Sequence, residues 1–384
     1  MIRAQDFIDE ATRQGFNFYA GVPCSYLTPL INGVISQAGL QYVGAASEGE
    51  AVGIAAGAWL AGRRCVVMCQ NSGLGNAVNP LTSLNASFGI PALLIVTWRG
   101  QPGHPDEPQH QLMGRITHEM LSLIEVDHSP FPDKPEHLAE ALTRARSTME
   151  AARRPFAFVM AEGTVESEPL RVKPRARSKG GPTEDRRGGG EPPSRAQILE
   201  RFLELVDPAS AVIATTGKTG RELFMLADRP QQLYLVGSMG CASGVGLGVA
   251  LNSERRVVVL DGDGAALMKL GTFATIGAYA PRNLVHILLD NGVHDSTGGQ
   301  PTVSASVCFD SIAQACGYAR AASCDDLDVF GKLFLAYGTL PGPSLIHVSI
   351  LPGSLPHLIR PTVTPADVAL RFKAFLAAQG QAHR

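Results

Sequence analysis

The chain has 384 residues, of which 45% are hydrophobic and 18% charged, with 33 Lys and Arg against 35 Asp and Glu. This length suits two domains with well-formed cores, and the nearly neutral balance argues against the broad basic surface of a nucleic-acid binder. Apolar runs stay short of the roughly 20 residues of a membrane span, and the first turns are unlike a signal peptide. Seven scattered cysteines favour reduced thiols over a zinc site. We therefore expect a cytoplasmic protein without a membrane or nucleic-acid partner.

The first half of the chain alternates between helix-like and strand-like segments. The helix-like segments are residues 4–14, 25–37 and 49–61. The strand-like segments are residues 16–23, 42–46, 65–70, 91–98 and 156–160. Ser25 is placed to cap the second helix. The runs 65–70 and 91–98 are continuously apolar, as in strands buried on both faces of a parallel sheet.

The second half repeats this scheme after a break in composition. Residues 171–193 contain almost no apolar side chains and predict a flexible linker. Ser194 then precedes a helix-like stretch, and the strand-like runs that follow are residues 211–216, 233–237, 256–261, 284–290 and 344–350. Such alternation is typical of parallel α/β sheets. The sequence predicts two similar, doubly wound α/β domains, residues 1–170 and 194–384, joined by the linker.

The strongest chemical signal is Gly262-Asp263-Gly264, followed after 26 residues by Asn291. Asp263 and Asn291 stand at the ends of successive predicted strands, so both belong at the carboxyl edge of a parallel sheet, where ligands bind. A carboxylate and an amide oxygen suit Mg²⁺, and the glycines let a diphosphate approach the backbone. A Gly-Asp-Gly turn alone is common turn chemistry, but together with Asn291 it predicts a diphosphate–Mg²⁺ site.

This motif resembles the thiamine diphosphate signature of the pyruvate decarboxylase-like enzymes. The resemblance implies thiamine diphosphate and Mg²⁺ as cofactors, with the metal bound by Asp263, Asn291 and the main chain of Val293. A Gly-Ser-Met-Gly turn resembles the family turn in which a bulky residue bends the cofactor, a role that falls to Met239 beside Ser238. It also implies that the first domain binds the pyrimidine and the second the diphosphate.

Residues 47–62 resemble the helix of this family that carries an acid for N1′ of the aminopyrimidine. In the family, this acid favours the imino tautomer that removes the thiazolium C2 proton. Glu48 and Glu50 both compete for the role, and the nine-residue interval to Gly57 favours Glu48. Glu50 is then expected to be a supporting or solvent-facing acid. A carboxylate suits the task because its hydrogen bond is stronger in an apolar pocket.

A narrower resemblance covers nearly all of both domains. Motifs like those of the phosphonopyruvate decarboxylase family lie in residues 21–30, 70–84, 106–117, 215–224 and 290–302. They imply a carbon–carbon lyase that converts 3-phosphonopyruvate to phosphonoacetaldehyde and CO₂, in phosphonate or phosphinate antibiotic biosynthesis. The alternative is decarboxylation of 3-sulfopyruvate to sulfoacetaldehyde. The short linker disfavours an acetolactate-type carboligase with a middle domain, and the presence of Glu48 disfavours a non-catalytic binding module.

An anionic 2-oxo acid substrate calls for fixed cationic donors. The basic candidates within the matched motifs are Arg99, His110, Arg115, Lys218, Arg221 and His294. Arg115 and Lys218 have structural ion pairs as the ordinary alternative. His110 and His294 are also candidates for protonating the enamine, since histidine titrates near neutral pH. Their alternative is a hydrogen-bonded position in a loop.

Small and polar residues after two predicted strands complete the candidate site. Asn71, Ser72 and Gly73 open a helix and could contact the pyrimidine or the substrate. Cys24 is expected to shape the substrate pocket, without acting as a nucleophile. Ser25 is a substrate candidate whose more ordinary interpretation is the helix cap.

The two halves of the predicted site lie in different domains. Glu48 belongs to the first domain and Asp263 to the second, yet both must hold one cofactor. In the family the two gripping domains come from different subunits. The resemblance therefore implies a homo-oligomer, at least a dimer, with active sites at the subunit interface.

Overall fold

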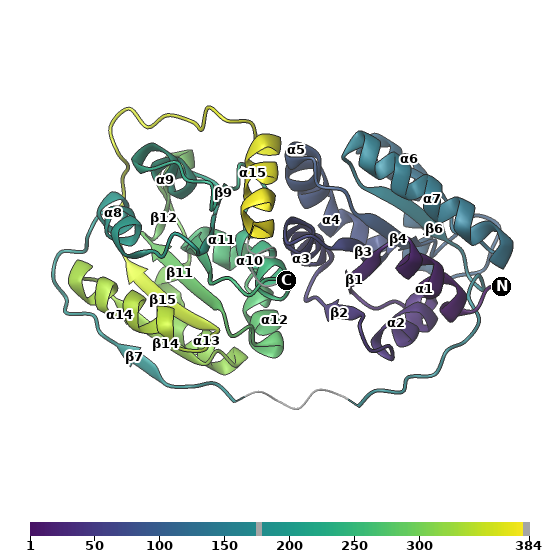
Figure 1. The fold of residues 1–384 in the computed structure, drawn as a ribbon, viewed down its shortest axis with the longest axis horizontal. Coiled ribbons are helices and arrows are strands. Elements are labelled where there is room, and N and C mark those ends of the chain that lie inside the picture. Colours follow the sequence, from purple (N-terminus) through teal and green to yellow (C-terminus); the bar gives the residue numbers. More distant parts are fainter. Residues whose placement is uncertain (174–178, 379–384) are drawn as a thin grey trace. The chain divides into compact units, whose positions relative to one another are not determined.

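The computed structural model describes residues 1–173 and 179–378. The chain divides into two compact units, Met1–Arg175 and Ala176–Arg384, and each folds around its own parallel sheet (Figure 1). The two parallel-sheet α/β domains expected from the sequence are therefore confirmed. Part of the predicted linker, residues 174–178, lies outside the described residues.

The first unit contains a six-stranded sheet in the order β2-β1-β3-β4-β6-β5, with every pair parallel. Its strands are β1 (Phe16–Gly21), β2 (Gln41–Gly44), β3 (Arg64–Gln70), β4 (Leu93–Thr97), β5 (Asp127–Pro130) and β6 (Phe156–Met160). The interiors of β3, β4 and β6 are buried because helices cover both faces, which explains their apolar sequences. Parallel pairing places the carboxyl ends of β1 to β4 along one edge.

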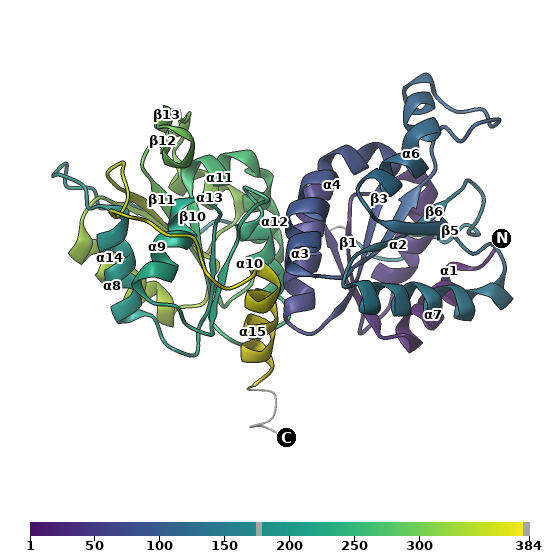
Figure 2. The same cartoon turned by 90° about the horizontal axis from the view of Figure 1, so that it is seen from above.

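Helices pack on both faces of this first sheet (Figure 2). They are α1 (Ala4–Arg13), α2 (Thr28–Ile35), α3 (Glu48–Leu60), α4 (Leu74–Pro80), α5 (Ala86–Phe88), α6 (Gln111–Leu123) and α7 (Pro135–Ala152). Helices α1, α2 and α7 share a core with alternate strand side chains such as Met68 and Ile95. Helices α3 and α4 cover the opposite face. Small residues let α3 be buried on nearly all sides.

The second unit contains a seven-stranded sheet in the order β7-β14-β15-β11-β10-β8-β9, again with every pair parallel. Its strands are β7 (Thr183–Asp185), β8 (Ala211–Ala214), β9 (Gln232–Tyr234), β10 (Val257–Gly262), β11 (Leu284–Asp290), β14 (Arg320–Cys324) and β15 (Ser344–Ser349). A short antiparallel pair, β12 (Val293–His294) and β13 (Gln300–Pro301), follows β11. The loops after β8, β9, β10 and β11 therefore leave adjacent positions of one edge.

Two groups of helices cover the second sheet. The helices are α8 (Arg195–Leu205), α9 (Lys218–Leu226), α10 (Ala242–Ala250), α11 (Asp263–Met268), α12 (Gly271–Tyr279), α13 (Phe309–Cys316), α14 (Leu327–Thr339) and α15 (Pro365–Ala377). Helix α8 packs against α9 and α14, while α10 and α13 each pack against α12. Ser194 caps α8 by accepting the Gln197 N–H at 3.2 Å. Within residues 1–173 and 179–378, no helix has the length and apolarity needed to cross a membrane.

Three local predictions differ from the structure. Ser25 does not cap a helix, because a 3₁₀ turn (Ser25–Leu27) precedes α2 and the Ser25 hydroxyl accepts a hydrogen bond from Arg99 instead. The sequence of residues 265–279 is helix-like and predicts one helix, but the structure breaks it near Lys269 into α11 and α12. Strands β5 and β14 were missed because their sequences, Asp-His-Ser-Pro and Arg-Ala-Ala-Ser-Cys, lack an apolar run.

The predicted linker also differs from the structure in its second half. Strand β7 pairs with β14 at the edge of the second sheet. The carboxylate of Asp325 then accepts the N–H groups of Gly188 and Gly189 at 2.8 and 2.9 Å. Backbone hydrogen bonds fix this segment without apolar side chains, so composition alone could not predict its order.

Candidate active site

The carboxyl edge of the second sheet gathers the residues predicted to bind metal and diphosphate. Gly262 and Leu289 are opposite each other in the β10–β11 register, so Asp263 and Asn291 leave the sheet at nearly the same level. Both line a cavity of about 270 Å³. The other predicted residues in its wall are Lys218, Met239, Gly262, Gly264, Val293 and His294. Long-range pairing of the strands thus joins residues that are far apart in the sequence.

Asp263 provides a buried carboxylate at the start of α11. Its exposed fraction is 4%, and burial raises the pKa of its carboxyl group because the charged form loses hydration. The hydroxyl of Thr302 donates a hydrogen bond to its Oδ2 at 2.5 Å. A buried carboxylate of this kind is stabilised in its ionised form by a cation. The site therefore fits Mg²⁺, which prefers oxygen ligands.

The amide of Asn291 is oriented by an acidic neighbour. Its Nδ2 donates to Oδ2 of Asp295 at 2.7 Å, and its Oδ1 accepts the Val293 N–H at 3.2 Å. Asp295 is itself held by the buried guanidinium of Arg195, with Nη2 and Oδ2 2.6 Å apart. Because Asp295 occupies the donor end of the amide, the carbonyl oxygen is the end that is available to a metal.

Gly264 brings two predicted cofactor contacts together. A β-carbon at this position would lie 2.7 Å from Cε1 of His294 and 3.1 Å from Cε of Met239. A larger residue would therefore force these side chains away from the first turn of α11. The preceding turn holds Ser238, which is buried and has a φ of 50°. The Gly-Ser-Met-Gly turn thus directs Met239 into the cavity.

Lys218 begins α9 on the neighbouring side of the cavity. It follows Gly217, whose φ of 96° is in a region that favours glycine. The ammonium group and the amino end of α9 both favour an anion at this side of the cavity. Within the described residues Lys218 has no ion pair, so the structural alternative for this residue is not observed.

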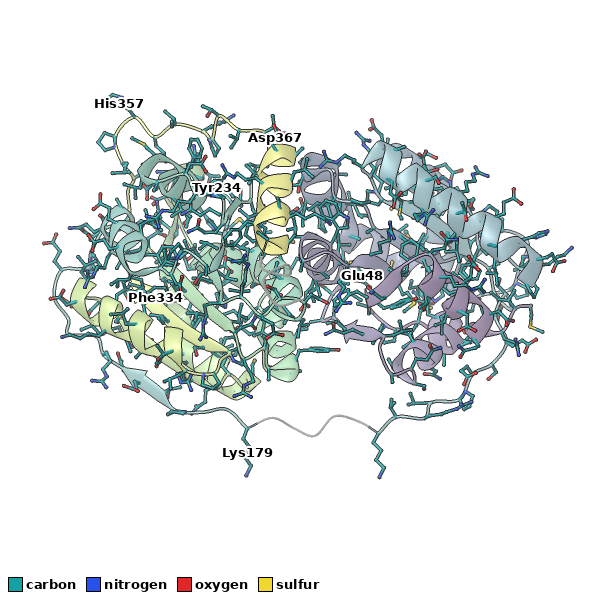
Figure 3. The ribbon with its side chains drawn as sticks, viewed as in Figure 1. Glu48, Lys179, Tyr234, Phe334, His357 and Asp367 are labelled. Atoms are coloured by element: carbon teal, nitrogen blue, oxygen red, sulfur yellow. The ribbon has the colours of Figure 1, made fainter. Side chains whose placement is uncertain are left out.

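Glu48 is the first residue of α3 in the first unit (Figure 3). Its carboxylate packs so closely on Gly73 that a β-carbon there would force the Glu48 side chain to move. Asn76 donates a hydrogen bond to Glu48 Oε2 at 2.8 Å. Glu50 is instead 2% exposed and accepts the Ala46 N–H at 2.7 Å, so it is not a solvent-facing acid. The geometry separates the two glutamates into a partly exposed one and a buried one.

The loop after β3 lies next to the loop after β1. Asn71 is fully buried, and its amide donates to a main-chain carbonyl at 2.8 Å and to Thr117 Oγ1 at 3.0 Å. Its side chain therefore supports the loop from inside. Ser72 is exposed and accepts from Gln70 Nε2 at 2.6 Å, while the Cys24 thiol donates to Gln70 Oε1 at 3.2 Å. Ser72 and Cys24 are thus linked through one glutamine.

Arg99 forms a bidentate ion pair with Asp106. Nε and Nη2 lie 2.8 and 2.5 Å from the two carboxylate oxygens, and Nη1 donates to Ser25 Oγ at 3.1 Å. The guanidinium also lies 4.8 Å from the ring centroid of Tyr26. This pairing raises the pKa of Arg99 and holds the pKa of Asp106 well below its usual range. Arg99, Ser25 and Asp106 therefore form one fixed cluster in the first unit.

Replacing Asp106 with Asn should lower the free energy of unfolding by about 2–4 kcal/mol, because Arg99 would keep a poorly hydrated charge without its partner. The depressed pKa of Asp106 makes this contribution complete above about pH 4, and it is lost as the pH falls. Urea unfolding of both proteins at pH 7 and pH 3 measures the effect. If wild type and variant differ in free energy of unfolding by the same amount at pH 3 as at pH 7, the stabilisation by Asp106 is not electrostatic.

His110 and Arg115 lie at and beyond the start of α6. His110 ends a 3₁₀ turn (Pro108–His110), is 8% exposed, and has a buried Nδ1 with no hydrogen-bond partner among the described residues. Such an atom is available to a ligand. Arg115 is exposed on α6 and has no ion pair within the described part of the chain. The structure does not bring Arg115 into the Arg99 cluster.

Sequence reasoning missed three residues that support the metal candidates, namely Thr302, Asp295 and Arg195. Thr302 and Asp295 lie within the motif 290–302, and the four-residue spacing from Asn291 to Asp295 was the available signal. Arg195 carries no local signal, because it reaches Asp295 from 100 residues away.

Models of known protein families match both units. The model described as the N-terminal TPP binding domain of thiamine pyrophosphate enzymes matches residues 1–120. The model described as the C-terminal TPP binding domain matches residues 216–348. The order of the two matches along the chain is the order of the two units.

Relatives of similar length show to which family of thiamine pyrophosphate enzymes the chain is similar in sequence. The chain is 49% identical over 378 residues to a phosphonopyruvate decarboxylase from Streptomyces viridochromogenes, covering 98% of this chain and 95% of that protein. It is also 49% identical over 377 residues to a phosphonopyruvate decarboxylase from Streptomyces hygroscopicus, covering 98% and 94%. A sulfopyruvate decarboxylase from Methanosarcina acetivorans is 28% identical over 410 residues, covering 98% of each chain. The chain therefore belongs to the phosphonopyruvate decarboxylase family of thiamine pyrophosphate enzymes.

Solved structures agree with this fold. Benzoylformate decarboxylase from Polynucleobacter necessarius has a TM-score of 0.72 at 14% identity, covering 93% of this chain and 100% of that chain. The 4-hydroxybenzoylformate decarboxylase from Rhodococcus jostii has a TM-score of 0.71 at 14% identity, covering 92% and 100%. At such low identity the likeness concerns the fold alone.

Proposed function

We propose that this protein decarboxylates 3-phosphonopyruvate to phosphonoacetaldehyde and CO₂ with thiamine diphosphate and Mg²⁺, in phosphonate or phosphinate antibiotic biosynthesis. The proposal is carried by the cavity that joins Asp263 and Asn291 at one sheet edge, in a chain 49% identical to phosphonopyruvate decarboxylases. The seven free cysteines fit the expected cytoplasmic location.

The second unit supplies the groups for the metal and the diphosphate in this proposal. Asp263, Asn291 Oδ1 and the main chain of Val293 are the metal ligands. The buried Asp263 carboxylate and the fixed Asn291 amide support this choice. Gly262 and Gly264 let the diphosphate approach the backbone, and Lys218 offers positive charge to an anion at the same cavity.

The remaining predicted residues bind and orient the reacting groups. When bound, thiamine diphosphate supplies the electron sink for loss of CO₂. Glu48 would hold N1′ of the pyrimidine through a hydrogen bond, and Met239 would pack against the bound cofactor. A histidine, His110 or His294, donates the proton that completes the aldehyde.

The first unit contributes further contacts in the proposal. Gly73 packs against Glu48, and Ser72 and the backbone of Gly73 would contact the pyrimidine. Cys24 and Ser25 shape the substrate pocket, and Arg99 holds Ser25 by a hydrogen bond to its hydroxyl. Asn71 supports this loop rather than the ligand directly.

We also propose a homo-oligomer, at least a dimer, with active sites at the subunit interface. The family resemblance supports it, because Glu48 and Asp263 belong to different domains that hold one cofactor. Sedimentation equilibrium of the purified protein with cofactors tests it. A monomer that retains full activity per chain would contradict it.

Asp295 is expected to set the affinity for Mg²⁺ by orienting the amide of Asn291. Changing Asp295 to Asn should raise the Mg²⁺ concentration for half-maximal thiamine diphosphate binding by about 10-fold or more, as for other groups that orient metal ligands. Calorimetric titration at several Mg²⁺ concentrations measures this. The matched control is Asp228→Asn, which removes a carboxylate paired with Arg371 elsewhere in the same unit. An equal shift in the control would contradict the role of Asp295.

The alternative substrate is 3-sulfopyruvate. The related sulfopyruvate decarboxylase is only 28% identical, which favours the phosphonate. Phosphorus NMR of the reaction mixture tests the proposed function directly. Phosphonopyruvate should be converted to phosphonoacetaldehyde only when thiamine diphosphate and Mg²⁺ are both present. Conversion that survives removal of both cofactors would contradict the proposal.

A further inference from the structure

A second cavity of about 460 Å³ lies in the second unit, on the other side of the loop that precedes α9. It shares Thr216 and Gly217 with the cavity that contains the metal candidates. The C-terminal segment between β15 and α15 runs past α9 (Figures 1 and 3), and it contributes Arg360, Pro361 and Val363 to the wall of this cavity. Thr216 and Gly217 therefore form a common wall of two neighbouring cavities.

The charge in this second cavity is all positive. Arg221 and Arg360 line it, and none of the described residues in its wall is acidic. Neither arginine has an ion pair within the described part of the chain, whereas Arg195 and Arg371 in the same unit are each paired with a carboxylate. Unpaired guanidinium groups that converge on one cavity favour an anionic ligand.

Two arginines also line a different cavity of the same unit, but there acidic residues balance their charge. Arg256 and Arg282 line that cavity together with Asp207 and Glu254, so its charges are balanced. The cavity of Arg221 and Arg360 lacks such compensation. It is therefore distinguished by uncompensated charge rather than by the presence of arginine.

Arg221 is anchored so that part of its guanidinium remains available. Its Nε donates to the carbonyl oxygen of Gly217 at 3.1 Å, one turn earlier in α9. The terminal nitrogens stay free to form the paired hydrogen bonds that guanidinium makes with phosphoryl oxygens. Arg360 belongs to the exposed C-terminal segment, and Val236 and Val363 add apolar side chains to the wall of the same cavity.

We propose that Arg221 and Arg360 bind the phosphonate group of the substrate, an inference that rests on the proposed function. The phosphonate would occupy the second cavity. The 2-oxo acid end would extend past Thr216 and Gly217 towards the cavity that contains Asp263 and Asn291. Two guanidinium groups match a phosphonate, which can carry two negative charges, better than a sulfonate, which carries one. Arg360 was not a candidate from the sequence, and it lies outside the matched motifs.

The test compares Arg221→Gln and Arg360→Gln with Arg282→Gln in the full-length holoenzyme. Each of the first two should lower kcat/KM for phosphonopyruvate about 10- to 100-fold, mostly through KM, and change kcat/KM for pyruvate less than about twofold. Arg282→Gln should change neither. Thiamine diphosphate affinity should be unchanged in all three. An equal loss on both substrates, or no loss on phosphonopyruvate, overturns the inference.

A binding measurement separates failure of this inference from failure of the proposed function. Phosphonoacetate is titrated into the wild-type holoprotein and the two variants by calorimetry, with acetate as the reference ligand. Phosphonoacetate should bind the wild type and bind each variant at least about 10-fold more weakly. If the wild type binds phosphonoacetate in this way but does not turn over phosphonopyruvate, the proposed function fails and the anion site stands. Equal affinities in wild type and variants overturn the site even if turnover is normal.

Discussion

Changing Glu48 to Gln should reduce turnover of phosphonopyruvate by about 10²–10⁴-fold, the range expected when a group that moves a proton is lost. Glutamine keeps the size and the contact with Gly73, but it cannot hold the proton of the carboxylic acid. Binding of thiamine diphosphate should fall far less, because the residues proposed to bind the metal and the diphosphate belong to the second unit. Steady-state kinetics and calorimetry on the same preparation separate the two effects.

Glu119→Gln is the matched control for this variant, since Glu119 is exposed on α6 in the same unit. It should leave turnover unchanged. Full activity of the Glu48→Gln protein with thiamine diphosphate bound would show that another acid activates the cofactor. Glu50 would then be the next candidate to replace, although Oε2 of its carboxylate already accepts the Ala46 N–H.

Changing Asp263 to Ala should abolish Mg²⁺-dependent binding of thiamine diphosphate, and with it all activity. The substitution removes the buried carboxylate that a divalent cation would neutralise. It also removes a burial cost, so the apoprotein should unfold at an equal or higher urea concentration than the wild type. Calorimetric titration with and without Mg²⁺ measures binding, and circular dichroism checks the fold.

The control for this substitution is Glu254→Ala, which removes an exposed acid from the same unit. Its cofactor affinity should match that of the wild type. Tight, Mg²⁺-dependent binding by the Asp263→Ala protein would contradict the assignment of the metal site. Loss of binding together with loss of the folded signal would instead point to a structural role for Asp263.

The sequence predicted most of the fold because buried parallel strands have an unmistakable composition. The interiors of β3, β4, β10 and β11 are buried and mostly apolar, since both faces of each sheet are covered. Strands β5, β7 and β14 lack this signal because they are short and partly polar. Their positions are fixed by backbone pairing to neighbours that the local sequence does not specify.

In the candidate site, too, some residues could be predicted from local sequence and others depend on long-range contacts. Gly262, Asp263, Gly264 and Asn291 could be placed together because each follows or ends a strand of one parallel sheet. The ion pair of Arg99 with Asp106 and the support of Asn291 by Asp295 depend on side-chain geometry. No periodicity or composition predicts such contacts. The family resemblance identified the motifs but not the residues that hold them in place.

The most direct test of the account is the specificity of the purified protein towards three 2-oxo acids. The values of kcat/KM for phosphonopyruvate, sulfopyruvate and pyruvate would be measured with saturating thiamine diphosphate and Mg²⁺, by coupled assay of the aldehyde and CO₂ released. We predict a preference for phosphonopyruvate of about 10-fold or more over each of the other two, or at least about 1.4 kcal/mol in transition-state binding. A preference for sulfopyruvate would contradict it and would leave only the cofactor site standing.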